Sequence, residues 1–220
     1  MIELPDFSKA FEYENNFYLS SDITRISKLI AHYELFKMIK EIPGEIVECG
    51  VFKGASFCRF ATFREIFGSV FSKKIIGFDT FGNFPEAKFR DDIDALKHQI
   101  SSDGDHSIEV EKLEKVLKHK GIDRNIELVK GDITKTVPKY VSDHPELKIS
   151  LLNLDVDIYE PSVTVLEKLF PKISKGGIII LDDYGTFPGE TKAVDEYFEK
   201  KNIKIKKFSF CMTPCYLVKE

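Results

Sequence analysis

Short apolar runs and helical periodicities alternate along this chain. Apolar side chains recur at helical spacing between residues 22 and 41, and Pro43-Gly44 ends the helix that they predict. Further on, the pattern predicts strands at 45–49, 74–79, 125–130, 149–155 and 177–182, separated by helices at 56–67, 108–119, 162–169 and 192–200. Residues 203–209 and 215–218 are expected to close the sheet as a hairpin. This alternation is typical of βαβ units and predicts an α/β fold with a mostly parallel sheet.

The organisation of the chain favours a single domain. The 220 residues contain no internal repeat and no low-complexity linker, so we expect one domain over 1–220. Its N-terminal segment, 1–42, is expected to be aromatic and irregular up to about residue 20 and helical after it. Residues 84–120 are more than one crossover requires. We interpret them as a lid over the ligand edge of the sheet, with a plain surface excursion as the alternative.

Four aspartates follow two of the predicted strands. Asp155 and Asp157 end one apolar run, and Asp182 and Asp183 end the next. Because open α/β sheets bind ligands beyond the carboxyl ends of their strands, we expect these acids at one sheet edge. Clustered carboxylates repel one another unless a cation or a proton neutralises them, and their oxygens suit Mg²⁺. The alternative is that Asp182 and Asp183 only cap a loop and pair with lysines.

A glycine loop follows the first strand. Glu48, Gly50 and Gly54 form the pattern E-x-G-x-x-x-G, which differs from the G-x-G-x-x-G of dinucleotide sites. The acid at its start suits a ligand with a cationic or hydroxyl-rich group, such as S-adenosylmethionine; a structural turn is the alternative. Asp79 ends the second strand, where an acid commonly binds ribose hydroxyls. Asp132, after the third strand, is a candidate for the border of the adenine.

Composition excludes several classes of protein. Charged residues make up 31% of the chain and the net charge is −4, which argues against a dedicated nucleic-acid binder. No apolar stretch approaches the roughly 18 residues of a membrane span. The N-terminus lacks the features of a signal peptide, so we expect a cytoplasmic protein. The cysteines fit no zinc pattern and are expected to be free thiols: Cys49, Cys58, Cys211 and Cys215.

Several segments together resemble the TylF-like (macrocin O-methyltransferase) family of S-adenosylmethionine- and Mg²⁺-dependent sugar O-methyltransferases. The resemblance spans roughly residues 40–200, is interrupted across 86–124, and rests on IPGEIVECGVFKGAS, GFDTFGNFP, VKGDITKTVP, LDVDIYEPSVTVLEKLFPKISKGGIIILDDYG and KAVDEYF. The D-x-D-x-Y element followed by GG-x-x-x-x-DDY is its specific part. The resemblance implies a class I methyltransferase (Rossmann-like) fold, with a mostly parallel seven-stranded sheet, one antiparallel strand and helices on both faces.

The resemblance also implies a role for each candidate residue. The metal ligands of the family fall on Asp155, Asp182 and Asp183, and its general base falls on Asp157. Mg²⁺ would favour the alkoxide of a sugar hydroxyl, while the base accepts the proton. The cofactor site would be lined by Glu48, Gly50, Gly54, Ser56, Asp79, Phe81 and Asp132.

The acceptor is left open by the sequence. A nucleotide sugar, a glycosylated natural product and a polysaccharide residue all fit, and the partner is expected to be such a small molecule or glycan. Asn153 and Glu160-Pro161 depart from the family pattern and are expected to border the acceptor. Two other functions stay open: a catechol-type O-methyltransferase with a phenolic acceptor, and a non-catalytic S-adenosylmethionine-binding protein. A homodimer is one option for the assembly.

Overall fold

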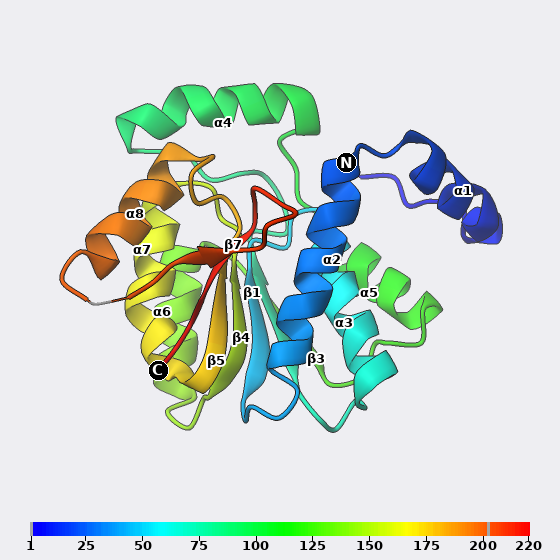
Figure 1. Cartoon of the computed structure of the whole chain (residues 1–220). Helices are drawn as coiled ribbons and strands as arrows, with labels where there is room; N and C mark the ends of the chain where they lie inside the picture. Colours follow the sequence, from blue (N-terminus) through cyan, green and yellow to red (C-terminus); the bar gives the residue numbers. More distant parts are fainter. Residues whose placement is uncertain (1, 202) are drawn as a thin grey trace.

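Uninterrupted apolar runs become the central strands of a seven-stranded sheet in the computed structural model, which describes residues 2–201 and 203–220 (Figure 1). The strands lie in the order β3-β2-β1-β4-β5-β7-β6. Neighbours among β1 to β5 are parallel, whereas β7 runs antiparallel to β5 and to β6. The bounds are β1 Glu45–Cys49, β2 Ile75–Asp79, β3 Ile126–Lys130, β4 Ile149–Leu154, β5 Ile173–Leu181, β6 Lys206–Lys207 and β7 Cys215–Val218. The predicted sheet, with its one antiparallel strand and its closing hairpin, is confirmed.

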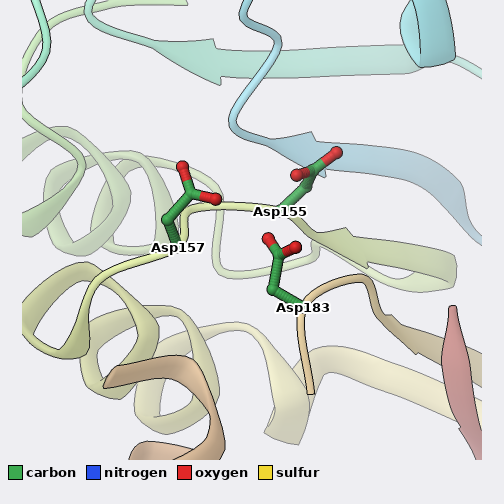
Figure 2. Close-up of side chains that lie close together, drawn as sticks. All are labelled: Asp155, Asp157 and Asp183. Atoms are coloured by element: carbon green, nitrogen blue, oxygen red, sulfur yellow. The ribbon is translucent and has the colours of Figure 1, made fainter. Parts of the chain in front are cut away.

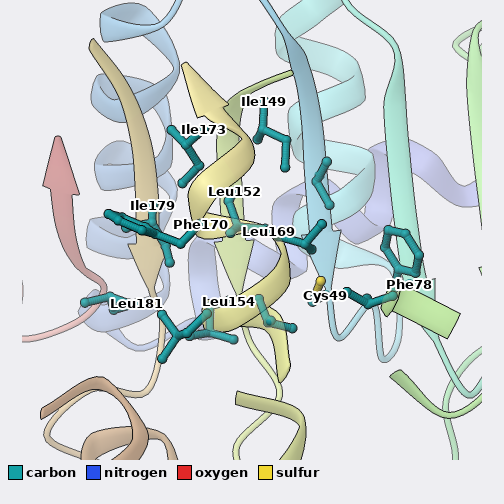
Figure 3. Packing of buried hydrophobic residues seen from close by; sticks show 14 of the residues in the cluster. Cys49, Phe78, Ile149, Leu152, Leu154, Leu169, Phe170, Ile173, Ile179 and Leu181 are labelled. Carbon is teal, nitrogen blue, oxygen red and sulfur yellow. The ribbon is translucent and has the colours of Figure 1, made fainter. Parts of the chain in front are cut away.

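Helices cover both faces of this sheet (Figure 1). One face packs against α2, α3 and α5, and the other packs against α6, α7 and α8. Alternation along each strand supplies both cores, so that Leu151 faces the first group of helices and Leu152 the second. Figure 3 shows the second core, where Leu152, Leu154, Ile179 and Leu181 lie with Leu169 and Phe170. The helices are α1 Ala10–Ser20, α2 Ile23–Met38, α3 Ala55–Phe67, α4 Arg90–Asp103, α5 Val110–His119, α6 Ile133–Asp143, α7 Tyr159–Lys168 and α8 Pro188–Phe198, with short 3₁₀ helices at Phe7–Lys9 and Phe170–Lys172.

The register of two central strands positions the site. β4 and β5 are adjacent and parallel, and Leu154 at the end of one is the partner of Leu181 at the end of the other. The strand edge continues one residue further, because Asp182 N donates to Leu154 O at 3.0 Å and Asp155 N donates to Cys49 O at 3.0 Å. The predicted juxtaposition of the two acidic segments at one sheet edge is therefore confirmed.

Three parts of the chain differ from the sequence-based prediction. Residues 90–103, for which no helix was predicted, form α4. Residues 10–20, expected to be irregular, form α1, although no residue of this helix is buried. Residues 133–143, for which no element was predicted, form α6 with Pro138 inside it. The side chain of Asp132 accepts from Thr134 N and caps the start of α6, and Ile133, Val137 and Tyr140 bury its apolar face. The burial of this apolar face therefore stabilises the helix by more than Pro138 destabilises it.

The long segment between β2 and β3 contains α4 and α5. α4 lies across the edge of the sheet at the top of Figure 1. It is attached near its start by Asp92, which is buried and accepts from Tyr159 N at 2.8 Å. Near its end, the Lys53 ammonium donates to the carbonyl of Asp103. That this segment acts as a lid stays a prediction.

Candidate active site

A cavity of about 600 Å³ opens at the carboxyl edge of the parallel strands. Its wall includes the turns that follow β1 to β5, the inner side of α4, and residues of α2 and α3. All four predicted acids line it, as do Gly50, Ser56, Asp79 and Asp132. The sequence thus located the residues of one continuous site, although they come from five different turns.

Three of the aspartates converge on one point of this cavity (Figure 2). Asp155, Asp157 and Asp183 each offer a carboxylate oxygen, and these oxygens all lie within 4.8 Å of one another. Asp157 adopts a left-handed backbone with φ of 61°, which is costly for a residue other than glycine. Strain of this kind persists where the surroundings enforce it, and it commonly marks functional sites. Here the unusual backbone places the second acid of the D-x-D pair beside Asp183.

Electrostatics makes this cluster unfavourable in the absence of a cation. Burial raises the pKa of Asp155, and the charges of Asp182 and Asp183 raise it further. Burial and then the Asp155 charge raise the pKa of Asp157 to about 7. The pKa of Asp183 is also raised by burial and by the Asp157 charge, and its Oδ2 has no hydrogen-bond partner within residues 2–201 and 203–220. Carboxylate oxygens that lie this close together, partly shielded from water and with hydrogen-bond donors no nearer than 3.5 Å, fit a hard divalent cation such as Mg²⁺.

Asp182 points to a different set of groups. Its Oδ2 accepts from the Lys28 ammonium at 2.5 Å, and its Oδ1 lies 3.8 Å from Nε2 of His32. Burial alone would raise the pKa of Asp182, but the Lys28 charge and the His32 interaction lower it to about 2. In the structure, Asp155, Asp157 and Asp183 lie together, while Asp182 faces Lys28 and His32. That Asp155, Asp182 and Asp183 bind a metal and that Asp157 acts as base stays a prediction. Oδ1 of Asp182 accepts no hydrogen bond from any described residue.

The glycine loop is built against this acidic edge. Gly50 has φ of 91°, and a Cβ placed on it would lie 1.6 Å from the carbonyl oxygen of Asp155. Only glycine fits that close approach. The Asp79 carboxylate closes the loop from the other side, since it accepts from Val51 N at 2.8 Å and from Phe52 N at 2.9 Å. It also accepts from Phe81 N at 2.7 Å. Asp79 therefore fixes the loop backbone, a role that the sequence did not reveal.

Four of the predicted binding residues do not reach the cavity wall. Glu48 is fully buried behind it, where its Oε1 accepts from Ser56 Oγ at 2.5 Å. Gly54 has φ of 82° and packs towards Leu113. Phe81 is 1% exposed and belongs to the core. Asn153, expected near the acceptor, is fully buried within the sheet, between Glu48 of β1 and Ile180 of β5. These positions correct the expectation of direct contact, because they support the wall from behind.

Several cavity residues were missed by the sequence reading. α2 contributes Arg25 and Lys28, α3 contributes Arg59, and α4 contributes Gln99. Nε2 of Gln99 lies 3.5 Å from Oδ2 of Asp157 and so connects α4 to the acid cluster. The only signal in the sequence was the spacing of Arg25 and Lys28, which places them on one helix face. The contacts themselves join positions far apart in the chain and depend on the fold.

The sheet order, the helices on both faces and the glycine loop beside the acidic edge define a class I methyltransferase fold. Residues 24–216 match the macrocin-O-methyltransferase (TylF) family, and the chain belongs to that family. The family match confirms the resemblance found in the sequence, and it extends over residues 24–216. The chain is similar to the solved structure of CalS11, a calicheamicin methyltransferase, with 28% sequence identity and a TM-score of 0.80. The matched region covers 94% of this chain and 84% of CalS11. A second structure of CalS11 describes it as a TDP-rhamnose 3'-O-methyltransferase.

Curated relatives extend the comparison. The chain is 26% identical over 151 residues to 8-demethyl-8-(2,3-dimethoxy-alpha-L-rhamnosyl)-tetracenomycin-C 4'-O-methyltransferase of Streptomyces olivaceus, covering 65% of this chain and 54% of that protein. It is 27% identical over 166 residues to mycinamicin III 3''-O-methyltransferase of Micromonospora griseorubida, covering 74% of this chain and 63% of that protein. The chain thus spans between half and two thirds of these relatives. Among the described residues, no helix is both long and apolar enough to cross a membrane.

Proposed function

We propose that this chain is an S-adenosylmethionine-dependent and Mg²⁺-dependent O-methyltransferase that acts on a sugar hydroxyl. One observation carries the proposal: three carboxylates, one of them buried and two half-buried, lie within 4.8 Å of one another in the cavity that the glycine loop also lines. Membership of the macrocin-O-methyltransferase family supports the reaction type. The names of the relatives, which include a TDP-rhamnose 3'-O-methyltransferase, support a sugar as the acceptor.

The β1 and β2 turns are proposed to bind the cofactor. When bound, S-adenosylmethionine supplies an electrophilic methyl group. Gly50 lets the backbone approach the ligand closely, and Asp79 holds the loop in the required shape. Ser56 lines the same wall, and Asp132 lines it at the start of α6. These residues bind and orient the cofactor, which is much of the catalysis expected when two reactants must meet in line.

The acidic edge is proposed to hold the metal and the base. When bound, Mg²⁺ lowers the pKa of a coordinated hydroxyl and fixes its position. Asp155 and Asp183 are the ligands that both the geometry and the family pattern support. Asp182 is proposed as the third ligand through its Oδ1, which has no hydrogen bond within the described residues while Lys28 holds Oδ2. Asp157 is proposed to accept the proton of the acceptor hydroxyl, and Gln99 is positioned to orient its carboxylate.

Calorimetry tests this proposal without knowledge of the acceptor. S-adenosylhomocysteine should bind the wild-type protein, and Mg²⁺ should then bind with an affinity that falls in an Asp155→Asn variant. A protein that binds neither ligand is not this kind of methyltransferase. If both bind, acceptor screens separate the alternatives: transfer only to phenolic acceptors favours a catechol-type enzyme, and transfer to none favours a non-catalytic binding protein. The homodimer and the cytoplasmic location stay predictions.

A further inference from the structure

The wall of the cavity formed by α2 and α3 carries three cationic side chains. Arg25 and Lys28 come from α2 and Arg59 comes from α3. Lys28 is paired with Asp182. In the part of the chain that the structure describes, neither Arg25 nor Arg59 forms an ion pair with a carboxylate. Two arginines therefore face a ligand cavity with their charge uncompensated.

Arg59 is held in place by a buried histidine. Its Nη1 donates to Nδ1 of His32 at 3.0 Å, and the His32 ring stacks on Phe60 with centroids 4.9 Å apart. A guanidinium can only donate, so Nδ1 of His32 must carry the lone pair and the ring proton lies on Nε2. One of the five N–H groups of Arg59 is thus used, and the described residues accept no others. The side chain is anchored and half-buried, with most of its donors free for a ligand.

The nearby acids do not neutralise this charge. Burial lowers the pKa of Arg59, and the carboxylates of Glu48 and Asp182 offset this only in part, while the Arg25 charge adds to it. Burial raises the pKa of Glu48 to about 8, which weakens its ability to neutralise Arg59. Asp182 is already engaged by Lys28. An anion brought into the cavity would gain from charge-assisted hydrogen bonds that the protein itself leaves unmade.

The position of Arg59 shows which part of the cavity it serves. It lies three residues after Ser56, so the two share one face of α3 and both line the cavity. α3 begins immediately after the glycine loop, at Ala55. We propose that Arg59, assisted by Arg25, forms an anion subsite that binds a carboxylate or phosphate group of a ligand in this cavity. The inference rests on the proposed function, which offers two sources: the carboxylate of the cofactor and the phosphates of a nucleotide sugar.

Three probes distinguish these sources by calorimetry. They are S-adenosylhomocysteine, its decarboxylated analogue S-adenosyl-3-thiopropylamine, and inorganic pyrophosphate added to protein saturated with S-adenosylhomocysteine. An Arg59→Met variant should lose roughly 10- to 100-fold in affinity for the anion that the subsite binds. Selective weakening of S-adenosylhomocysteine, with the decarboxylated analogue unchanged, identifies the cofactor carboxylate. Selective weakening of pyrophosphate identifies the phosphates of the acceptor.

Two further variants guard against trivial explanations. Arg25→Met keeps the hydrogen bond between Arg59 and His32, and should give a smaller loss of about 3-fold. Lys88→Met removes the same charge from another side of the same cavity and should change neither affinity. The proposal is overturned if Arg59→Met leaves both anions within twofold of wild type, if it weakens the decarboxylated analogue equally, or if Lys88→Met has the same effect. Failure of wild type to bind S-adenosylhomocysteine would instead contradict the proposed function, and pyrophosphate added to the protein alone would still decide the subsite.

Discussion

The two halves of the cavity floor use carboxylates in opposite ways. In the β1–β2 half, Asp79 accepts three backbone N–H groups and the Thr80 hydroxyl. In the β4–β5 half, Asp155, Asp157 and Asp183 lie close together, and their donors, the Gln99 amide and the Thr186 hydroxyl, are both 3.5 Å away. An acid surrounded by close donors is stabilised by the fold, whereas a group of acids with only distant donors destabilises it. The hydrogen bonds of the first half are complete within the protein, whereas the second half would be completed by the proposed cation.

The largest effects, on turnover and on Mg²⁺ affinity, are expected when Asp157 and Asp182 of the second half are replaced separately by asparagine. Asp157→Asn should lower turnover by about 10²- to 10⁴-fold with Mg²⁺ affinity unchanged, because it removes a proton acceptor. Asp182→Asn should lower Mg²⁺ affinity by at least about 10-fold, because it removes a ligand. Calorimetry measures the Mg²⁺ affinity of both variants, and initial rates measure their turnover. A larger loss of Mg²⁺ affinity in Asp157→Asn would place Asp157 among the ligands and Asp182 with Lys28 alone.

The junction between the two halves should respond nearly as strongly. Gly50→Ala places a Cβ 1.6 Å from the Asp155 carbonyl, so we expect a loss of more than about 4 kcal/mol in unfolding free energy. Gly104→Ala is the matched control: its φ of 87° is close to the 91° of Gly50, and no atom lies within 4 Å of the added Cβ. Its ψ of 166° lies in a region that residues other than glycine rarely adopt, so this variant should cost about 1–3 kcal/mol, still less than Gly50→Ala. Equal losses in urea denaturation would show that the contact with Asp155 does not matter.

A third pair of variants compares the halves directly. Asp79→Asn should destabilise the protein by about 1–3 kcal/mol, because one oxygen that accepts N–H groups becomes an amide donor. Asp183→Asn, measured in EDTA, should leave stability unchanged or raise it, because it removes repulsion from the cluster. Thermal unfolding checks both. If Asp183→Asn destabilised the metal-free protein as much as Asp79→Asn, the contrast between the halves would be wrong.

A pH dependence that comes from Glu48 tests the first half of the cavity separately. Burial raises its folded-state pKa from 4.5 to about 8, so the stability that it contributes is complete below about pH 4.5 and is lost as pH rises to 8. Glu48→Gln removes this titration. The melting temperature of the variant minus that of wild type should therefore increase from pH 5 to pH 8 and then level off. A difference that stayed constant over this range would mean that Glu48 ionises normally in the folded protein.

Much of the fold followed from the sequence because its signals are local. The β-branched run of β5 and the turn after Ile42 depend on neighbouring residues alone. α6 was missed because Pro138 reads as a breaker, and only the fold reveals the core that buries Tyr140. α1 was missed because its aromatic side chains follow no clear periodicity, and none of them is buried.

The candidate site was predictable to the level of the strand ends and not beyond. Acids after adjacent parallel strands must meet, which gave the cluster. A lysine partner for Asp182 was one alternative from the sequence, but its identity as Lys28 joins residues 154 positions apart and depends on the fold. The same holds for the contacts of Asp79 with the loop and for the burial of Phe81, since both depend on how turns from different strands pack together.

Transfer of a labelled methyl group tests the central claim most directly. S-adenosylmethionine carrying the label in its methyl group is incubated with a panel of nucleotide sugars and rhamnosides, in Mg²⁺ and in EDTA, with wild type and Asp183→Asn. The account predicts that wild type labels at least one sugar hydroxyl in Mg²⁺, and that EDTA or Asp183→Asn reduces the rate by more than about 100-fold. Undiminished transfer in EDTA would contradict it.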